Sequence, residues 1–258
     1  MESDVKIKVT FEHIDDLFVK CAEHAMKDLS LTTSNRIIKQ WIDKLPQYID
    51  AFKAYKYQAI EIGGSYEHSA DSFLYMQCFS SSLKSLYSVV FNIKTEDNHK
   101  AWTSLIDAYD YLSVCEAFVR KYPPIDDVHV NGLKYMIELC KSWENVFFPK
   151  SPYFNSTGMK ETLGTCSVCS SDFLTCCHIE GDIYLGRYCR RIDRKIISID
   201  HVALVERPRD KRCLITTRHD DNGFLIDFFS RERIENEKDP KPDTYQSIIF
   251  SLNQIDLD

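Results

Sequence analysis

Residues 166–189 read CSVCSSDFLTCCHIEGDIYLGRYC, and this stretch decides how the rest of the chain is interpreted. Five of the ten cysteines of the chain fall within it. Cys166 and Cys169 have the Cys-x-x-Cys spacing, in which backbone amides point at the first thiolate and both sulfurs face one ion. Disulfides are disfavoured in a reducing cell, so a cluster of this kind indicates a metal site.

Zinc is the metal that this spacing favours, and tetrahedral zinc takes four ligands. We expect four of the following five residues to bind it: Cys166, Cys169, Cys176, His178 and Cys189. Gly181 and Gly186 are placed for the tight turns that bring Cys189 back to the cluster. Four protein ligands leave no open coordination position, so the predicted site is structural rather than catalytic. The alternatives are a metal-free cluster and a redox pair at Cys166 and Cys169; a thioredoxin-like pair would require a βαβ context.

The first 148 residues predict an α-helical bundle. Apolar residues recur at spacings of three and four over residues 11–29, 33–62, 68–93, 95–121 and 130–147. Pro46 is expected to kink or break the second segment, and Thr95 to begin the fourth. Long helices joined by short turns should pack as antiparallel neighbours.

The pattern changes at Pro149. Residues 149–165 are rich in Pro, Ser, Gly and Thr and are predicted to be a linker. Residues 166–258 follow with short β-prone runs, among them 196–205, and Asn222-Gly223 is a strong hairpin signal. Residues 243–254 are expected to form a closing helix. The predicted fold class is therefore α+β, with an N-terminal helical bundle and a small zinc-stapled, β-rich module.

The spacing C166SVC169, C176CHIEG181 and Y184LGRYC189, followed by HVALVERP at residues 201–208, resembles a zinc module of uncharacterised bacterial and phage-associated proteins. The resemblance covers residues 164–215. It implies that zinc is carried by the matching cysteines and by His178, and it brings no activity with it. The chain departs from the pattern at Cys177, an extra thiol that blurs the ligand assignment.

A basic segment follows the cysteines, because residues 187–218 hold 10 basic against 4 acidic residues in a chain of net charge -7. Nucleic-acid binding is the first alternative function, through a phosphate-binding face. Its residues would be Arg187, Arg190, Arg191, Arg194, Lys195, Arg207, Arg209, Lys211 and Arg212. The negative net charge argues against strong non-specific binding.

The second alternative is a nuclease of the ββα-metal type. Asp200-His201 after a Cys-x-x-Cys pair is similar to the water-activating histidine of those enzymes, with His219 and Asn222 as further groups. Against it, a second Cys-x-x-Cys pair is missing and His201 lies in a predicted strand.

The preferred interpretation is a non-enzymatic zinc-binding protein that acts through protein–protein contacts. The helical region would dock a protein partner or a second copy of the chain. The resemblance adds a setting in phage–host conflict. The sequence shows no signal peptide and no apolar run of membrane-spanning length, so a cytoplasmic protein without membrane contact is expected.

Overall fold

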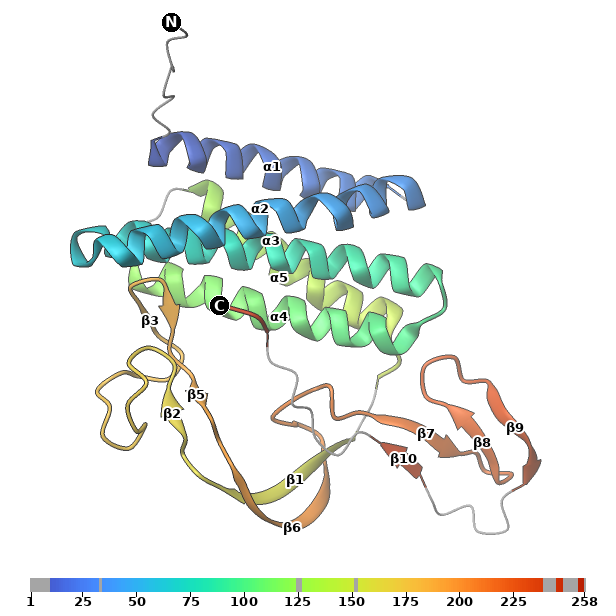
Figure 1. The fold of residues 1–258 in the computed structure, drawn as a ribbon. Coiled ribbons are helices and arrows are strands. Elements are labelled where there is room, and N and C mark those ends of the chain that lie inside the picture. Colours follow the sequence, from blue (N-terminus) through green and yellow to red (C-terminus); the bar gives the residue numbers. More distant parts are fainter. Residues whose placement is uncertain are drawn as a thin grey trace, which may run out of the picture.

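The computed structural model describes residues 10–32, 34–123, 127–150, 153–238, 245–247 and 255–257 (Figure 1). Among these residues, five α-helices are followed by small antiparallel sheets, which confirms the predicted α+β fold class. The helices are α1 (Phe11–Leu31), α2 (Asn35–Ile62), α3 (Glu67–Lys94), α4 (Asn98–Lys121) and α5 (Asp127–Phe147), with a short 3-10 turn, η1 (Gly64–Tyr66), before α3. None of the helices in these ranges combines the length and apolarity that a membrane crossing requires.

Two of the helices begin where a side chain caps them. Thr10 accepts the backbone N–H of His13 at the start of α1 (3.4 Å), and Asp97 accepts that of Lys100 at the start of α4 (3.2 Å). The predicted start of the fourth helix at Thr95 is three residues early. Thr95 ends α3, because the Asp97 side chain is the one that reaches an amide of the first turn.

α2 continues through Pro46, so the predicted break does not occur. A proline inside a helix costs about 3 kcal/mol. The helix buries Ile38, Trp41, Leu45 and Phe52 along one face. Each of these side chains contributes roughly 1.5–3 kcal/mol on burial, and together they outweigh the cost of the proline.

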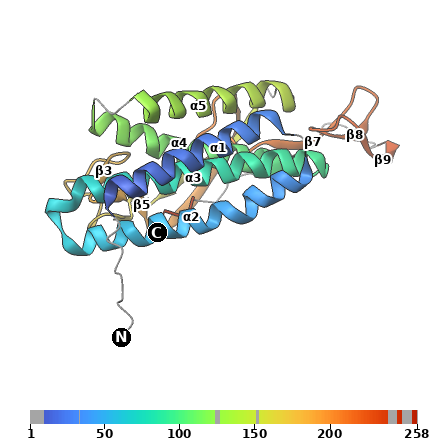
Figure 2. The ribbon, with the colours of Figure 1, turned by 90° about the horizontal axis from the view of Figure 1, so that it is seen from above.

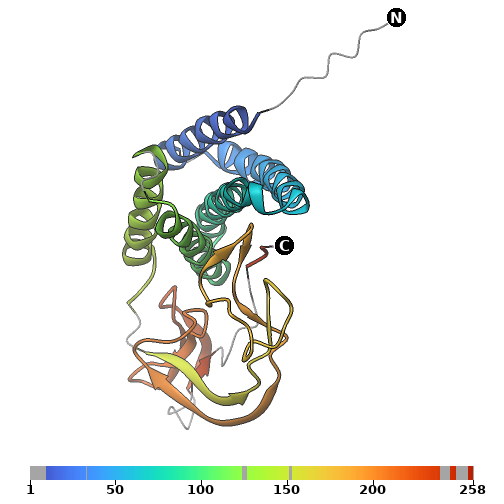
Figure 3. The same cartoon turned by 90° about the vertical axis from the view of Figure 1, so that its left-hand side faces the viewer.

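α3 is the central helix of the bundle. It packs against α1, α2 and α4, and Figures 2 and 3 show it enclosed by the other helices. Its side chains are buried on nearly every side, as a central helix requires. The Tyr87 hydroxyl donates to the carbonyl of Ala25 in α1 (2.7 Å), and the Tyr75 hydroxyl donates to that of His129 in α5 (3.1 Å).

Short strands make up the second part of the described chain, on one side of the bundle (Figure 1). They are β1 (Phe154–Glu161), β2 (Thr165–Cys166), β3 (Ile183–Tyr184), β4 (Arg187–Tyr188), β5 (Arg191–Ile192), β6 (Ile196–Val205), β7 (Ile215–His219), β8 (Phe224–Asp227), β9 (Arg233–Lys238) and β10 (Tyr245–Ser247). β1 pairs with β6, β2 with β5 and β3 with β4, and a four-stranded sheet has the order β10-β7-β8-β9. The predicted hairpin at Asn222-Gly223 is confirmed as the β7–β8 connection.

Two sequence-based assignments in this part are wrong. The predicted linker over 149–165 contains β1, which pairs antiparallel with β6 from Phe154 opposite Val205 to Glu161 opposite Ile196. The pairing satisfies backbone groups of β6, which a flexible linker would leave without a strand partner. Within the predicted closing helix, residues 245–247 form β10 against β7, because that edge of the sheet accepts another strand. Residues 243–244 and 248–254 of that predicted helix lie outside the described ranges.

The bundle and the β-rich part share one buried core. Phe154, Ile183, Leu214 and Phe228 belong to the same hydrophobic cluster as the helix residues. The indole N–H of Trp102 in α4 also donates to the carbonyl of Lys211, just before β7 (2.8 Å). The β-rich part is therefore held against the helices by packing as well as by hydrogen bonds.

Candidate metal centre

The Cys166–Cys169 turn has the geometry of a metal knuckle. Cys166 ends β2, and its backbone carbonyl accepts the N–H of Ser170 (2.8 Å). The N–H of Val168 donates to the Cys166 sulfur (3.4 Å), which confirms the predicted approach of backbone amides to the first thiolate. Ser170 has a φ of 58°, and this left-handed conformation closes the turn.

Cys176 and His178 enter the site from the following loop. The Asp172 side chain accepts the N–H of Leu174 (2.8 Å), and this interaction shapes the loop. The N–H of His178 donates to the Cys176 sulfur (3.2 Å). The His178 ring packs edge-on against Tyr184 of β3, with 4.5 Å between ring centroids. The imidazole is thereby oriented towards the sulfurs.

The four donor atoms have the spacing of a tetrahedral site. One ligand atom from each of Cys166, Cys169, Cys176 and His178 lies within 4.8 Å of the others. The Cys169 and Cys176 sulfurs are 3.8 Å apart, and His178 Nδ1 lies 3.8 Å from the Cys166 sulfur and 3.3 Å from that of Cys176. A metal–sulfur bond of about 2.3 Å places two sulfurs of a tetrahedron about 3.8 Å apart. These residues can therefore hold a metal ion.

Cys189, the fifth predicted ligand, does not join that group of four but lies beside it. Its side chain is buried, and its sulfur is 3.8 Å from the Cys166 sulfur. The structure thus leaves two arrangements, with Cys189 either a neighbour of the metal or a substitute for one ligand. Cys177, the extra thiol, is exposed.

The thiols of the site differ in how easily they ionise. Burial opposes ionisation of Cys166, but the N–H groups of Cys169 and Val168 donate to its sulfur and lower its pKa from 9.0 to about 7. The N–H of Ser171 likewise lowers the pKa of Cys169. Burial raises the pKa of Cys176 to about 11 and that of Cys189 to about 12. The knuckle therefore supplies the readier thiolates, which are the form that binds a metal.

Tertiary contacts fix the turns that return Cys189 to the site. Its N–H donates to the Asp182 carbonyl and its carbonyl accepts the Gly181 N–H, both at 2.8 Å. Gly186, in the β3–β4 turn, has a φ of 71°, and a Cβ there would lie 3.1 Å from both the Cβ and the carbonyl oxygen of Ala70. A residue without a side chain lets this turn press against α3.

The sequence did not reveal Asp71, which holds that turn. Its buried carboxylate accepts the N–H of Gly186 and also accepts from Lys121 (2.7 Å) and the Tyr122 hydroxyl (2.7 Å). The one available signal was a carboxylate between Ala70 and Phe73 in a helix that is otherwise apolar at these positions.

The predicted nucleic-acid-binding residues mostly contact the chain itself. Seven of the nine side chains pair with groups of the chain itself, namely Arg187, Arg190, Arg191, Arg194, Arg209, Lys211 and Arg212. Arg212 is 5% exposed and pairs with Asp107 (2.5 Å), Asp110 (2.7 Å) and Asp210 (3.1 Å). It joins the β-rich part to α4 and is not presented to a phosphate. Lys195 and Arg207 lie at the two ends of β6, outside the strand.

The residues of the nuclease alternative do not form one site with the cysteines. His201 lies in β6 opposite Gly158, and His219 lies at the end of β7 opposite Leu225. No helix follows β6 among the described residues, whereas a ββα arrangement requires one. Within the same ranges, the cysteine–histidine cluster is the one group of His, Cys, Asp and Glu residues with metal-binding spacing.

Comparison of the chain with protein-family models, with curated proteins and with solved structures gives no match. The functional argument therefore depends on the geometry of the site.

Proposed function

We propose that this chain is a zinc-binding protein without catalytic activity, in which the metal completes the β-rich part and function depends on protein–protein contacts. The observation that carries the proposal is the convergence of three thiols and one imidazole within 4.8 Å. Three cysteines and one histidine are a ligand set of structural zinc sites, and such a set leaves no position for a substrate.

Zinc would supply what the local strands lack. β2, β3, β4 and β5 contain two residues each, so they offer few hydrogen bonds of their own. The ion would link the knuckle at Cys166 to the loop at His178 and hold both beside β5. Free energy of metal binding then becomes free energy of folding for this segment.

Metal analysis tests this proposal. The purified, reduced chain should contain one zinc per molecule, and cobalt substitution should give the absorption of a tetrahedral thiolate site. Cys169→Ser should abolish stoichiometric binding. Cys177→Ser is the matched control, because it removes an adjacent exposed thiol and should leave the metal in place. A reduced wild-type chain without stoichiometric metal contradicts the proposal.

The β1–β6 ribbon supports the protein contacts. Opposite Met159 and Gly158, β6 carries Ile199 and His201, so Asp200 is an extra residue in the strand. A one-residue bulge shifts the side-chain alternation by one, and Val202 and Leu204 therefore continue the face of Ile199. These three apolar residues are 44–52% exposed, and two more, Ile196 and Ile197, precede them on the strand.

The contact is assigned to a second copy of the chain. Among the described residues, β6 pairs on one edge alone, with β1. The unpaired backbone groups of an antiparallel edge strand can pair with the same strand of a second copy about a two-fold axis. The exposed apolar side chains of β6 would be covered in such a dimer. The contact through the helices stays a prediction, and the exposed apolar residues of β6 support a second contact surface on the ribbon. The resemblance of the cysteine module extends the proposal to a bacterial or phage setting, including phage–host conflict.

A further inference from the structure

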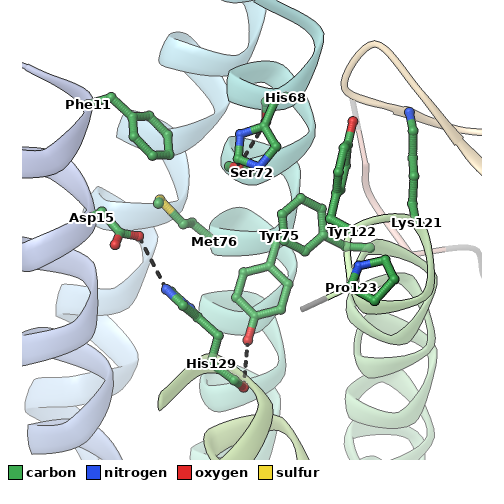
Figure 4. Close-up of a pocket in the computed structure, with 11 residues that line it drawn as sticks. Phe11, Asp15, His68, Ser72, Tyr75, Met76, Lys121, Tyr122, Pro123 and His129 are labelled. Atoms are coloured by element: carbon green, nitrogen blue, oxygen red, sulfur yellow. Dashed lines mark hydrogen bonds and ion pairs between the residues drawn. The ribbon is translucent and has the colours of Figure 1, made fainter. Parts of the chain in front are cut away.

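A cavity of about 460 Å³ opens at one end of the bundle. Figure 4 shows its lining: Phe11 and Asp15 come from α1, and His68, Ser72, Tyr75 and Met76 from α3, while Lys121, Tyr122 and Pro123 lie at the end of α4 and His129 at the start of α5. Phe118 of α4 completes the lining. A volume of this size accommodates a small organic molecule.

Aromatic rings make up much of the wall. The ring centroids of His68 and Tyr122 are 4.7 Å apart, those of Tyr122 and Phe118 are 5.1 Å apart, and those of Phe118 and Tyr75 are also 5.1 Å apart. Phe11 lies 6.5 Å from His68 and extends this arc onto α1. The electron-rich faces of such rings attract cations.

The ammonium of Lys121 is committed to other groups. It donates to Glu67 (2.6 Å), to Asp71 (2.7 Å) and to the carbonyl of Ile183 (2.9 Å). A lysine ammonium has three protons, so these contacts use its full donor capacity. The lysine at the cavity wall is therefore not available to an anionic ligand.

The hydroxyl protons of the cavity wall are also donated to groups of the chain itself. Ser72 donates to the carbonyl of His68 (2.8 Å), Tyr75 donates to that of His129 (3.1 Å), and Tyr122 donates to Asp71. A hydroxyl that donates its proton in this way can offer a ligand only a lone pair, as an acceptor. The polar groups of the wall thus favour a ligand that brings its own donors.

The charge of the lining also favours a cationic ligand. Asp15 lines the cavity from α1, with its carboxylate 3.4 Å from His129 Nε2 (Figure 4). Among the lining residues Asp15 is the carboxylate, because Glu67 and Asp71 pair with Lys121 and do not line the cavity. We propose that this cavity binds a small organic cation, an amine with an apolar body, between the aromatic rings and with Asp15 as its counter-ion. The proposal is independent of the metal centre.

A matched ligand series tests the proposal on the full-length, metal-loaded chain. Titration calorimetry would compare 2-phenylethylamine, 2-phenylethanol and phenylacetate, which share a ring and differ in charge. The amine should bind about tenfold more tightly than the alcohol, and the acid should bind most weakly. An amine that does not bind, or that binds no better than the alcohol, overturns the proposal.

Variants of α1 locate the binding. Asp15→Asn should lower the affinity for the amine by about tenfold and leave that for the alcohol unchanged. Asp16→Asn is the control, since it makes the same charge change at an exposed position of the same helix outside the cavity. Equal losses in the two variants would mean a general charge effect and would overturn the assignment. Phe11→Leu, which keeps an apolar side chain but removes a ring, should also weaken binding of the amine.

Discussion

The carboxylate of Asp71 in α3 accepts the backbone N–H of Gly186, which lies in the turn between β3 and β4. One side chain of the bundle thereby fixes the turn that leads back to Cys189. Asp71 is 0% exposed, and Lys121 donates to its second oxygen. The segment of the candidate metal centre is thus positioned by the helices as well as by its own turns.

Replacement of Asp71 should therefore destabilise the whole chain. Asp71→Ala removes the acceptor of the Gly186 amide and of the Tyr122 hydroxyl, while Lys121 keeps Glu67 and the carbonyl of Ile183 as partners. A buried polar group that loses its partner costs about 1–3 kcal/mol. Urea unfolding followed by circular dichroism measures the change. Asp43→Ala, at an exposed position of α2, should stay within about 0.5 kcal/mol of wild type. Equal effects of the two variants would contradict this role of Asp71.

Gly186→Ala should weaken the contact between the β3–β4 turn and α3. The new Cβ would meet Ala70 and Lys56, each at 3.1 Å, in a backbone conformation that already disfavours a side chain. We expect a loss of about 1–3 kcal/mol. Gly63→Ala is the matched control: Gly63 also has a positive φ, but a Cβ there meets nothing within 4 Å. The difference between the two losses of unfolding free energy in urea measures the cost of the close contact with Ala70 and Lys56. Equal losses would show that this contact does not contribute.

Metal content distinguishes the two candidate ligand sets. If the group of four is the ligand set, Cys176→Ser should lose zinc, because it removes a sulfur that lies 3.3 Å from His178 Nδ1. Cys189→Ser should retain one zinc per chain. The opposite result would assign Cys189 to the metal in place of Cys176. Elemental analysis of both proteins under reducing conditions gives the answer.

The β7–β8 turn should respond to acid through Asp220. The N–H groups of Phe224 and Asn222 donate to its carboxylate and lower its pKa below 3.8. A carboxyl whose pKa is lower in the folded state stabilises that state above its unfolded pKa, and the effect is lost as pH falls through the folded pKa. The difference in urea midpoint between wild type and Asp220→Ala should thus be constant down to about pH 5 and shrink below about pH 4.

Metal loss at low pH affects both proteins in that comparison alike, so their difference isolates the Asp220 carboxyl. Asp221→Ala provides the control, because it removes an exposed carboxyl from the next position. A difference between wild type and Asp220→Ala that does not change with pH would contradict the assignment.

The β1–β6 ribbon predicts self-association. Light scattering should find a dimer of the 30.1 kDa chain, and Val202→Lys should shift it to the monomer by placing a charge on the apolar face. Ile234→Lys makes a similar change at an exposed position of β9, outside the ribbon, and should leave the dimer intact. A wild-type chain that stays monomeric at high concentration would contradict the proposal that the ribbon binds a second copy.

Local patterns predicted much of this fold. Residues at spacings of three and four gave the five helical segments, since an amphipathic stripe is written along one stretch of chain. Asn222-Gly223 gave the β7–β8 hairpin for a similar reason, because two residues determine the turn. The assignment of 149–165 to a linker failed because the partner of β1 is β6, and the composition of a strand does not contain its pairing.

The sequence by itself determined the residue types of the candidate metal centre, since the knuckle at Cys166 and the loop at His178 are built from contacts a few residues apart. Only the tertiary structure decided what surrounds them. Asp71 and Gly186 are separated by 115 positions, and Asp15 reaches the same cavity as His129. Such pairs form when packing of the helices removes side chains from water, and no local spacing records which distant groups then meet.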